Sequence, residues 1–168
     1  MKDKNIGDKK DIVEYGYTSC CDTDFVSILM WDFDGNIRLK DIIKSLSEIQ
    51  RKYVLSEIYI IKTRNGYHAV CLDKFKFIDA LNIISNTRFI DKTFIKISRK
   101  RNHFVHRIGD DRKLVWIIYP RAVYYSCICR REKSNAHRIL LEKMFHIEIR
   151  KDKFFDKNTI AKCVVYAR

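Results

Sequence analysis

The sequence predicts an α+β domain in which a mainly antiparallel sheet carries its helices on one face. Segments with β-type and helical periodicity alternate in the order β-α-β-β-α-β-β, which is typical of that class. Asn65-Gly66 between two apolar runs is a strong local signal for a hairpin. The length of 168 residues and the 46% apolar content are those of one globular domain with a sizeable core.

The first predicted elements follow a polar N-terminal segment. Residues 1–24 are rich in Lys and Asp with little periodicity, and we expect a flexible tail. A strand is expected at residues 25–33, and Asn36 is placed to cap a helix at residues 37–54. The apolar residues at helical spacing in that helix are Leu39, Ile42, Ile43, Leu46, Ile49 and Tyr53.

The middle of the chain predicts the rest of the sheet. Strands are expected at residues 57–63 and 66–72, on either side of the turn Arg64-Asn65-Gly66, followed by a helix at residues 74–86. Further short strands are expected at residues 93–97, 104–108 and 114–119. A sheet with helices on one face leaves its second face for a ligand.

Pro120, the only proline, marks the end of a predicted core at residues 25–120. Residues 121–168 then form a C-terminal extension packed on the same domain. In it we expect a strand at residues 123–129, a helix at residues 135–145 capped by Ser134, and a last strand at residues 162–167.

The chain is strongly basic. The sequence has 34 Lys and Arg residues and 21 Asp and Glu residues, which gives a net charge of +13. We therefore expect a polyanionic partner, and nucleic acid is the leading candidate. An anionic membrane surface and simple solubilisation are the alternatives. No apolar run is long enough to span a membrane and no secretory signal is present, which predicts an intracellular protein, in the cytoplasm or, for a viral protein, in the host cell. The six cysteines lack metal-site spacing.

Two acids close the first core strand in the run FVSILMWDFDG. Side chains of a strand alternate between its faces, so Asp32 and Asp34 point to one side, and Trp31 and Phe33 point to the other. Two neighbouring carboxylates repel each other, and Mg²⁺ or Mn²⁺ is the usual partner of such oxygens. The alternative interpretation is a strand that ends in a polar Asp-Gly turn.

Three further features carry candidate chemistry. His68 lies within a predicted strand, where it is either a half-buried structural residue or a phosphate contact. Arg107 also lies within an apolar strand and needs an anionic partner: Asp110 or Asp111, or a nucleotide phosphate. The run Arg99-Lys100-Arg101 is either a solvated turn or a phosphate-binding cluster.

These motifs, in this order, resemble the catalytic core of archaeo-eukaryotic primases and primase-polymerases over residues 25–118. The matching residues are the hydrophobic-Asp-hydrophobic-Asp strand end, the histidine of NGYHAV, and the basic segment that leads to Arg107-Ile108-Gly109. The resemblance implies an RRM-like core, which agrees with the predicted order of elements. A chain with no clear zinc-binding insertion and no helicase module would be a minimal member, typical of viral or plasmid replication proteins.

The resemblance implies a nucleotidyltransferase of DNA replication that uses Mg²⁺ or Mn²⁺. Asp32 and Asp34 would hold the metal, and His68, counted with them as catalytic, would contact the phosphates of a nucleoside triphosphate together with Arg64 and Arg107. The family completes its metal site with a third acid. Asp91 after Ile90 fits that pattern, and Asp110 and Asp111 are the alternatives.

The implied partners are a single-stranded DNA or RNA template, which Arg99, Lys100 and Arg101 would hold, and a replication helicase as a separate protein. The main alternative is a catalytically inactive RRM-like protein that binds single-stranded nucleic acid. Its stacking residues would be Tyr67, Trp116, Tyr124 and Tyr125.

A rolling-circle nickase is the third hypothesis. It needs two histidines on one strand face, and the spacing of His103 and His106 puts them on opposite faces.

Overall fold

The computed structural model describes residues 13–21, 25–109, 111–121, 131–157 and 163–167 of the chain. It confirms the α+β class with a mainly antiparallel sheet. In chain order the described elements are β1 (Val13–Thr18), β2 (Val26–Asp34), α1 (Leu39–Tyr53), β3 (Ile58–Lys62), β4 (Gly66–Lys76), α2 (Phe77–Ser85), α3 (Lys92–Arg101), β5 (Val105–Arg107), β6 (Lys113–Ile118), α5 (Asn135–Phe145) and β7 (Cys163–Ala167).

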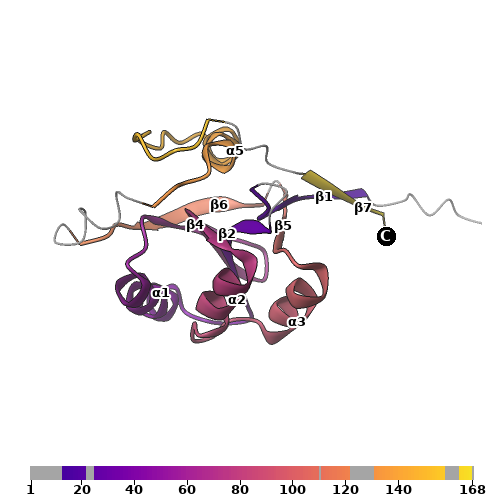
Figure 1. Cartoon of the computed structure of the whole chain (residues 1–168). Coiled ribbons are helices and arrows are strands. Elements are labelled where there is room, and N and C mark those ends of the chain that lie inside the picture. Colours follow the sequence, from indigo (N-terminus) through magenta and orange to yellow (C-terminus); the bar gives the residue numbers. More distant parts are fainter. Residues whose placement is uncertain (1–12, 22–24, 110, 122–130, 158–162, 168) are drawn as a thin grey trace, which may run out of the picture.

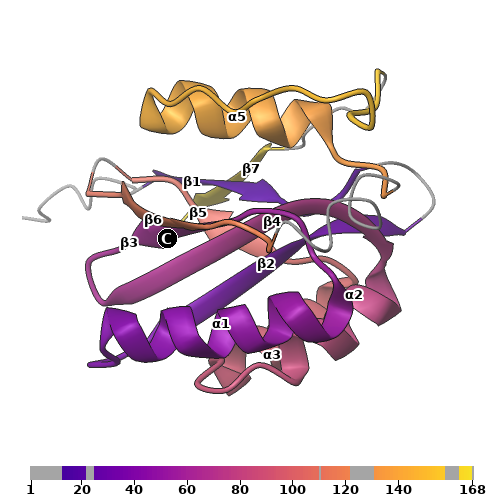
Figure 2. The ribbon, with the colours of Figure 1, turned by 90° about the vertical axis from the view of Figure 1, so that its left-hand side faces the viewer.

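The central sheet has the strand order β2-β4-β3-β6, and each neighbouring pair is antiparallel. Because β2 and β3 both run against β4, they are parallel to each other, and α1 connects them across β4 as a split β-α-β unit. Helices α1, α2 and α3 lie on one side of this sheet, and α5 lies on the opposite side (Figures 1 and 2). The predicted one-sided arrangement of helices therefore holds for the first three.

A second sheet has the order β5-β1-β7. Its middle strand, β1, occupies residues 13–18, which the sequence analysis assigned to a flexible tail, so that prediction is wrong there. Strands β5 and β6 follow each other in the chain but belong to different sheets. The chain therefore passes from one sheet to the other between them. Strand β2 is an edge strand of the central sheet, and β5 and the start of α3 lie along its outer edge.

The main core lies between the central sheet and its helices. Trp31 and Phe33 are fully buried on β2, and the indole Nε1 of Trp31 donates a hydrogen bond of 2.8 Å to the hydroxyl of Thr87, just after α2. Ile42 and Leu46, one turn apart on α1, are also fully buried. The predicted alternation on β2 is therefore observed, with the apolar side chains toward the helices.

Three predicted boundaries or types are corrected. Residues 93–97 are part of helix α3, because the Asp91 carboxylate caps it by accepting hydrogen bonds from the amides of Thr93 and Phe94. Helix α1 begins after Arg38 and not after Asn36. Strand β4 continues to Lys76, so α2 begins at Phe77 and not at residue 74.

The C-terminal part agrees with the prediction where it is described. Ser134 caps α5, and β7 forms at Cys163–Ala167. The imidazole of His137 bonds the backbone carbonyl of Thr18 at 2.7 Å, which fixes α5 to the end of β1. The strand expected at residues 123–129 lies outside the described residues. Within the described parts of the chain, every helix is too short or too polar to cross a bilayer.

Candidate functional site

The acids of β2 lie at the edge of the central sheet. Asp32 is half-buried and Asp34 is exposed at the end of the strand. On the outer side of β2, the Asp32 carbonyl accepts a hydrogen bond of 2.9 Å from the Asp91 amide, and the Trp31 carbonyl bonds His106 Nε2 at 3.1 Å. These two bonds hold the start of α3 and strand β5 against the carboxylates.

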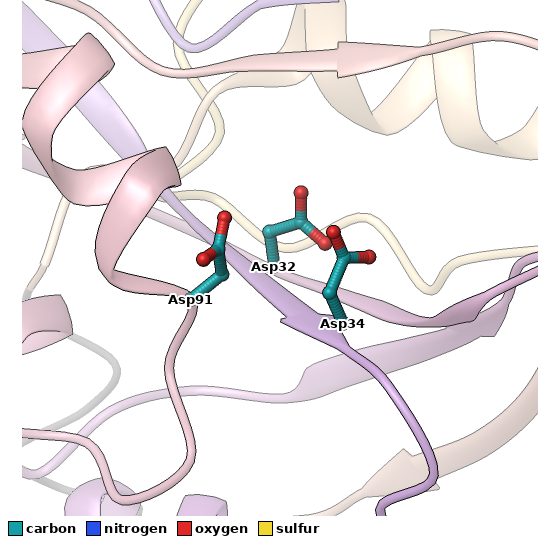
Figure 3. A group of neighbouring side chains, drawn as sticks. All are labelled: Asp32, Asp34 and Asp91. Carbon is teal, nitrogen blue, oxygen red and sulfur yellow. The ribbon is translucent and has the colours of Figure 1, made fainter.

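Asp91 is thereby brought to the predicted pair. One carboxylate oxygen from each of Asp32, Asp34 and Asp91 lies within 4.8 Å of the others, and the three groups converge in Figure 3. The Asp91 carboxylate also caps α3, at 3.0 Å from the Thr93 amide and 2.8 Å from the Phe94 amide. Each carboxylate oxygen has a second lone pair, so capping leaves Asp91 able to bind a cation.

Of the other two candidates for the third acid, the structure describes only Asp111, which does not join this group. Asp111 is exposed and bonds Arg112 at 3.1 Å, and Asp110 lies outside the described residues. Within the described residues no second group of three His, Cys, Asp or Glu side chains comes this close together. Asp91 is thus the acid that the fold places beside Asp32 and Asp34.

The electrostatics of this acidic cluster favour a bound cation. Burial, followed by the charges of Asp34 and Asp91, raises the pKa of Asp32 to about 7, against the opposing effect of Arg112 and Arg107. The candidate ligands are all carboxylate oxygens, a set that fits a hard cation such as Mg²⁺ or Mn²⁺ better than zinc or copper. A cation between the three groups would remove their mutual repulsion.

His68 lies opposite Asp32 in the β2–β4 register, with its Nε2 3.6 Å from Asp32 Oδ1. Burial, followed by the charges of Arg112 and Arg107, lowers the pKa of His68 to about 3. The imidazole is therefore neutral at physiological pH, and its contact with Asp32 is not an ion pair. As a neutral ring it can donate one hydrogen bond toward the pocket.

His106, which the sequence analysis considered only for a nickase, lies directly behind His68. The two rings stack with centroids 4.0 Å apart and planes 14° from parallel. A backbone carbonyl only accepts, so Nε2 of His106 carries the proton that bonds Trp31, and Nδ1 accepts from the Tyr17 hydroxyl at 3.3 Å. His106 is buried and fully bonded, and it fixes the plane of the His68 ring.

A pocket of about 400 Å³ opens beside the acids, and four arginines line it: Arg64, Arg101, Arg107 and Arg112. Arg64 comes from the β3–β4 turn and Arg101 from the last turn of α3. In the predicted basic run, Arg101 lines the pocket, whereas Arg99 and Lys100 are exposed elsewhere on α3. We refer to this cavity, with the three acids and His68, as the acidic pocket.

Two arginines differ from expectation. Arg107 was expected to be buried in its strand, but its side chain is exposed on β5 and lines the acidic pocket. Arg112 was not predicted at all, because the segment from Gly109 looked like an ordinary turn. Its Nε donates a hydrogen bond of 2.8 Å to the Arg107 carbonyl, and its charge acts on both Asp32 and His68.

Two aromatic residues of the alternative hypothesis, Tyr67 and Trp116, lie on the face of the sheet opposite to Asp32 and His68. Tyr67 alternates with His68 on β4, so it points to the face that holds α1 and α2, where Lys62 lies 4.2 Å from its ring centre. Trp116 pairs with Ile60, which pairs with Ala69, and this register puts Trp116 on the same face as Tyr67. Tyr124 and Tyr125 lie outside the described residues.

Comparison of the chain with protein-family models, with curated proteins and with solved structures finds no match. The case for a function therefore rests on the geometry of the acidic pocket and on the motifs of the sequence.

Proposed function

We propose that this protein is a primase- or polymerase-like nucleotidyltransferase that adds nucleotides from nucleoside triphosphates on a nucleic-acid template. The observation that carries the proposal is the convergence of Asp91 with Asp32 and Asp34 beside a pocket lined by arginines. Three carboxylates with phosphate-binding groups next to them are what metal-dependent phosphoryl transfer requires. The primase-like order of the sequence motifs, which include these acids, also supports the proposal.

The residues divide the work by their chemistry. Asp32, Asp34 and Asp91 hold the divalent cation, and Arg64, Arg107 and Arg112 are placed to bind phosphate oxygens. The neutral His68 donates a hydrogen bond to a phosphate and leaves the positive charge to the arginines. Bound Mg²⁺ or Mn²⁺ would supply charge neutralisation for the in-line displacement of pyrophosphate.

The partners follow from the same proposal. The net charge of +13 supports binding of a single-stranded DNA or RNA template. The primase-like motifs place the activity in replication, in the setting of a virus or plasmid, with a helicase as a separate partner. That setting stays a prediction.

The test is nucleotide incorporation on a primed template with Mn²⁺ or Mg²⁺. Asp32→Asn and Asp91→Asn are each expected to reduce incorporation by at least about a hundredfold, since losing one ligand misplaces the charge that stabilises the transition state. Asp79→Asn, an exposed acid on α2, is the matched control and should leave the rate unchanged. Undiminished incorporation by both site variants would overturn the proposal.

The second candidate is a binding protein for single-stranded nucleic acid without chemistry, which the basic charge also supports. Isothermal titration separates the two, because only the nucleotidyltransferase should bind a deoxynucleoside triphosphate in a Mn²⁺-dependent way. The position of Tyr67 and Trp116 on the face that holds α1 and α2 counts against a stacking platform beside the acids.

A further inference from the structure

A second pocket, of about 420 Å³, adjoins the acidic pocket. Its lining is Gly35, Asn36, Ile37, Arg38, Lys62, Arg64 and Asn65. Arg64 and Asn65 line both cavities, so the two meet at the β3–β4 turn. We propose that this second pocket, called here the basic pocket, binds the phosphodiester backbone of a single nucleic-acid strand whose end lies in the acidic pocket, a role that rests on the proposed function.

The floor of the basic pocket is built from two turns that are fixed to each other. The Gly35 amide donates a hydrogen bond of 3.0 Å to the Asn65 carbonyl. A Cβ on Gly66 would lie 1.9 Å from the Phe33 carbonyl oxygen, so the β3–β4 turn rests directly on the end of β2. Above Gly35, which has φ +95°, nothing lies within 4 Å of the Cβ position. The backbone at the bottom of the basic pocket is therefore held rigidly, and the space above it is accessible to a ligand.

The charge of the lining differs sharply between the two cavities. The acidic pocket mixes three carboxylates with four arginines, whereas the basic pocket has three cationic side chains and no carboxylate in its lining. A cation fits the first and an anion fits the second. The two lie side by side, as a phosphate backbone next to a metal site requires.

Two of the cations are held in defined positions. The Arg38 guanidinium bonds Asp41 through Nε at 2.6 Å and Nη2 at 3.2 Å, and its remaining N–H groups are available to a ligand. The Lys62 ammonium lies over the ring of Tyr67. Side chains that are already ordered lose less entropy when they bind a phosphate.

The shape of the pair of cavities favours a single strand. A volume of about 400 Å³ is that of a small-ligand site and is too small for a duplex. A free nucleotide would occupy the acidic pocket alone, whereas a strand can continue over Arg64 into the basic pocket. The exposed basic end of α3, with Arg99 and Lys100, lies outside both cavities.

The test is fluorescence anisotropy with a labelled single-stranded DNA of about twelve nucleotides, in EDTA, at several salt concentrations. Arg38→Ala/Lys62→Ala should weaken binding about five- to tenfold and reduce the slope of log K against log salt by about 1.4, the value for two phosphate contacts on a single strand. The matched control, Lys40→Ala/Lys44→Ala, removes the same charge from the exposed side of α1. It should change affinity less than about twofold.

A charge-preserving variant, Arg38→Lys/Lys62→Arg, is expected to keep the wild-type affinity, and circular dichroism checks that all variants fold. Equal losses in the test and control variants would overturn the proposal, as would no loss in either or the absence of strand binding by the wild type. Mn²⁺-dependent nucleotide binding, measured on the same proteins, should survive in Arg38→Ala/Lys62→Ala. Its absence from the wild type would instead count against the proposed nucleotidyltransferase and leave the strand site standing.

Discussion

Two aspartates on neighbouring strands, Asp73 of β4 and Asp32 of β2, lie in opposite kinds of surroundings. Asp73 is completely buried and accepts hydrogen bonds from the Ser56 amide at 2.9 Å and the Ser56 hydroxyl at 2.5 Å. Arg131 lies 3.5 Å from its carboxylate. Asp32 is only half-buried, yet its carboxylate faces those of Asp34 and Asp91.

The pKa values express the same contrast. Burial raises the pKa of both groups, but at Asp73 the Ser56 hydrogen bonds and the Arg131 charge oppose that rise. The acids around Asp32 add to the effect of burial and raise its pKa to about 7. Donors around a carboxylate mark a structural role, whereas acids around a carboxylate indicate a site arranged for a cation at some expense of stability.

The largest expected effect is at the structural aspartate. Asp73→Ala should destabilise the protein by about 3 kcal/mol or more, because it leaves the Ser56 groups and the Arg131 charge without their buried partner. Urea denaturation measures the loss, with the exposed Asp79→Ala as control. A loss of less than about 1 kcal/mol in the free energy of unfolding would contradict the structural role assigned to Asp73.

A somewhat smaller effect is expected from metal at the acidic cluster. Mn²⁺ at a hundred times its dissociation constant should stabilise the wild type by about 2.7 kcal/mol. Asp91→Asn should abolish most of this gain but leave α3 intact, because asparagine also caps helices well. Thermal unfolding with and without Mn²⁺ tests it. An undiminished gain in Asp91→Asn would show that Asp91 is not a ligand.

The smallest effect is a gain of stability in the absence of metal. Because the raised pKa makes folded Asp32 hold its proton more tightly than the unfolded chain does, stability falls as pH rises from about 4 to about 7. Asp32→Asn should therefore stabilise the protein by about 1–2 kcal/mol at pH 8 in EDTA, a figure reduced from the full shift for partial exposure. Near pH 4 the difference should vanish. A destabilised variant at pH 8 would contradict the electrostatic argument.

Local patterns in the sequence predicted the features that depend on neighbouring residues. The period of two placed Asp32 and Asp34 on one face, and Ser134 correctly marked the start of α5. The same reasoning failed for residues 93–97, whose β-branched side chains suggested a strand. The cap at Asp91 and the burial of Phe94 and Ser98 one turn apart outweigh that preference.

Features that depend on contacts between residues far apart in the sequence were not predicted. Strand β1 is held by its pairing with β5 and β7, which come much later in the chain. Its run VEYGYT does alternate apolar with polar or small residues, a period-two signal that the sequence analysis missed next to the Lys- and Asp-rich residues before it. The stacking of His106 on His68 and the role of Arg112 arise only when β5 lies along the edge of β2. A single sequence carries no signal for such contacts.

The carboxylate of Asp91 both belongs to the acidic cluster and caps α3, so it links the cluster to that helix. A cation that draws electron density from its oxygens weakens their hold on the Thr93 and Phe94 amides, and it also faces the positive end of the helix dipole. Loading of the cluster would then be felt at the first turn of α3, whose last turn carries Arg101 into the same pocket. Helix α3 therefore joins the proposed metal ligand Asp91 at its start to the pocket-lining Arg101 at its end.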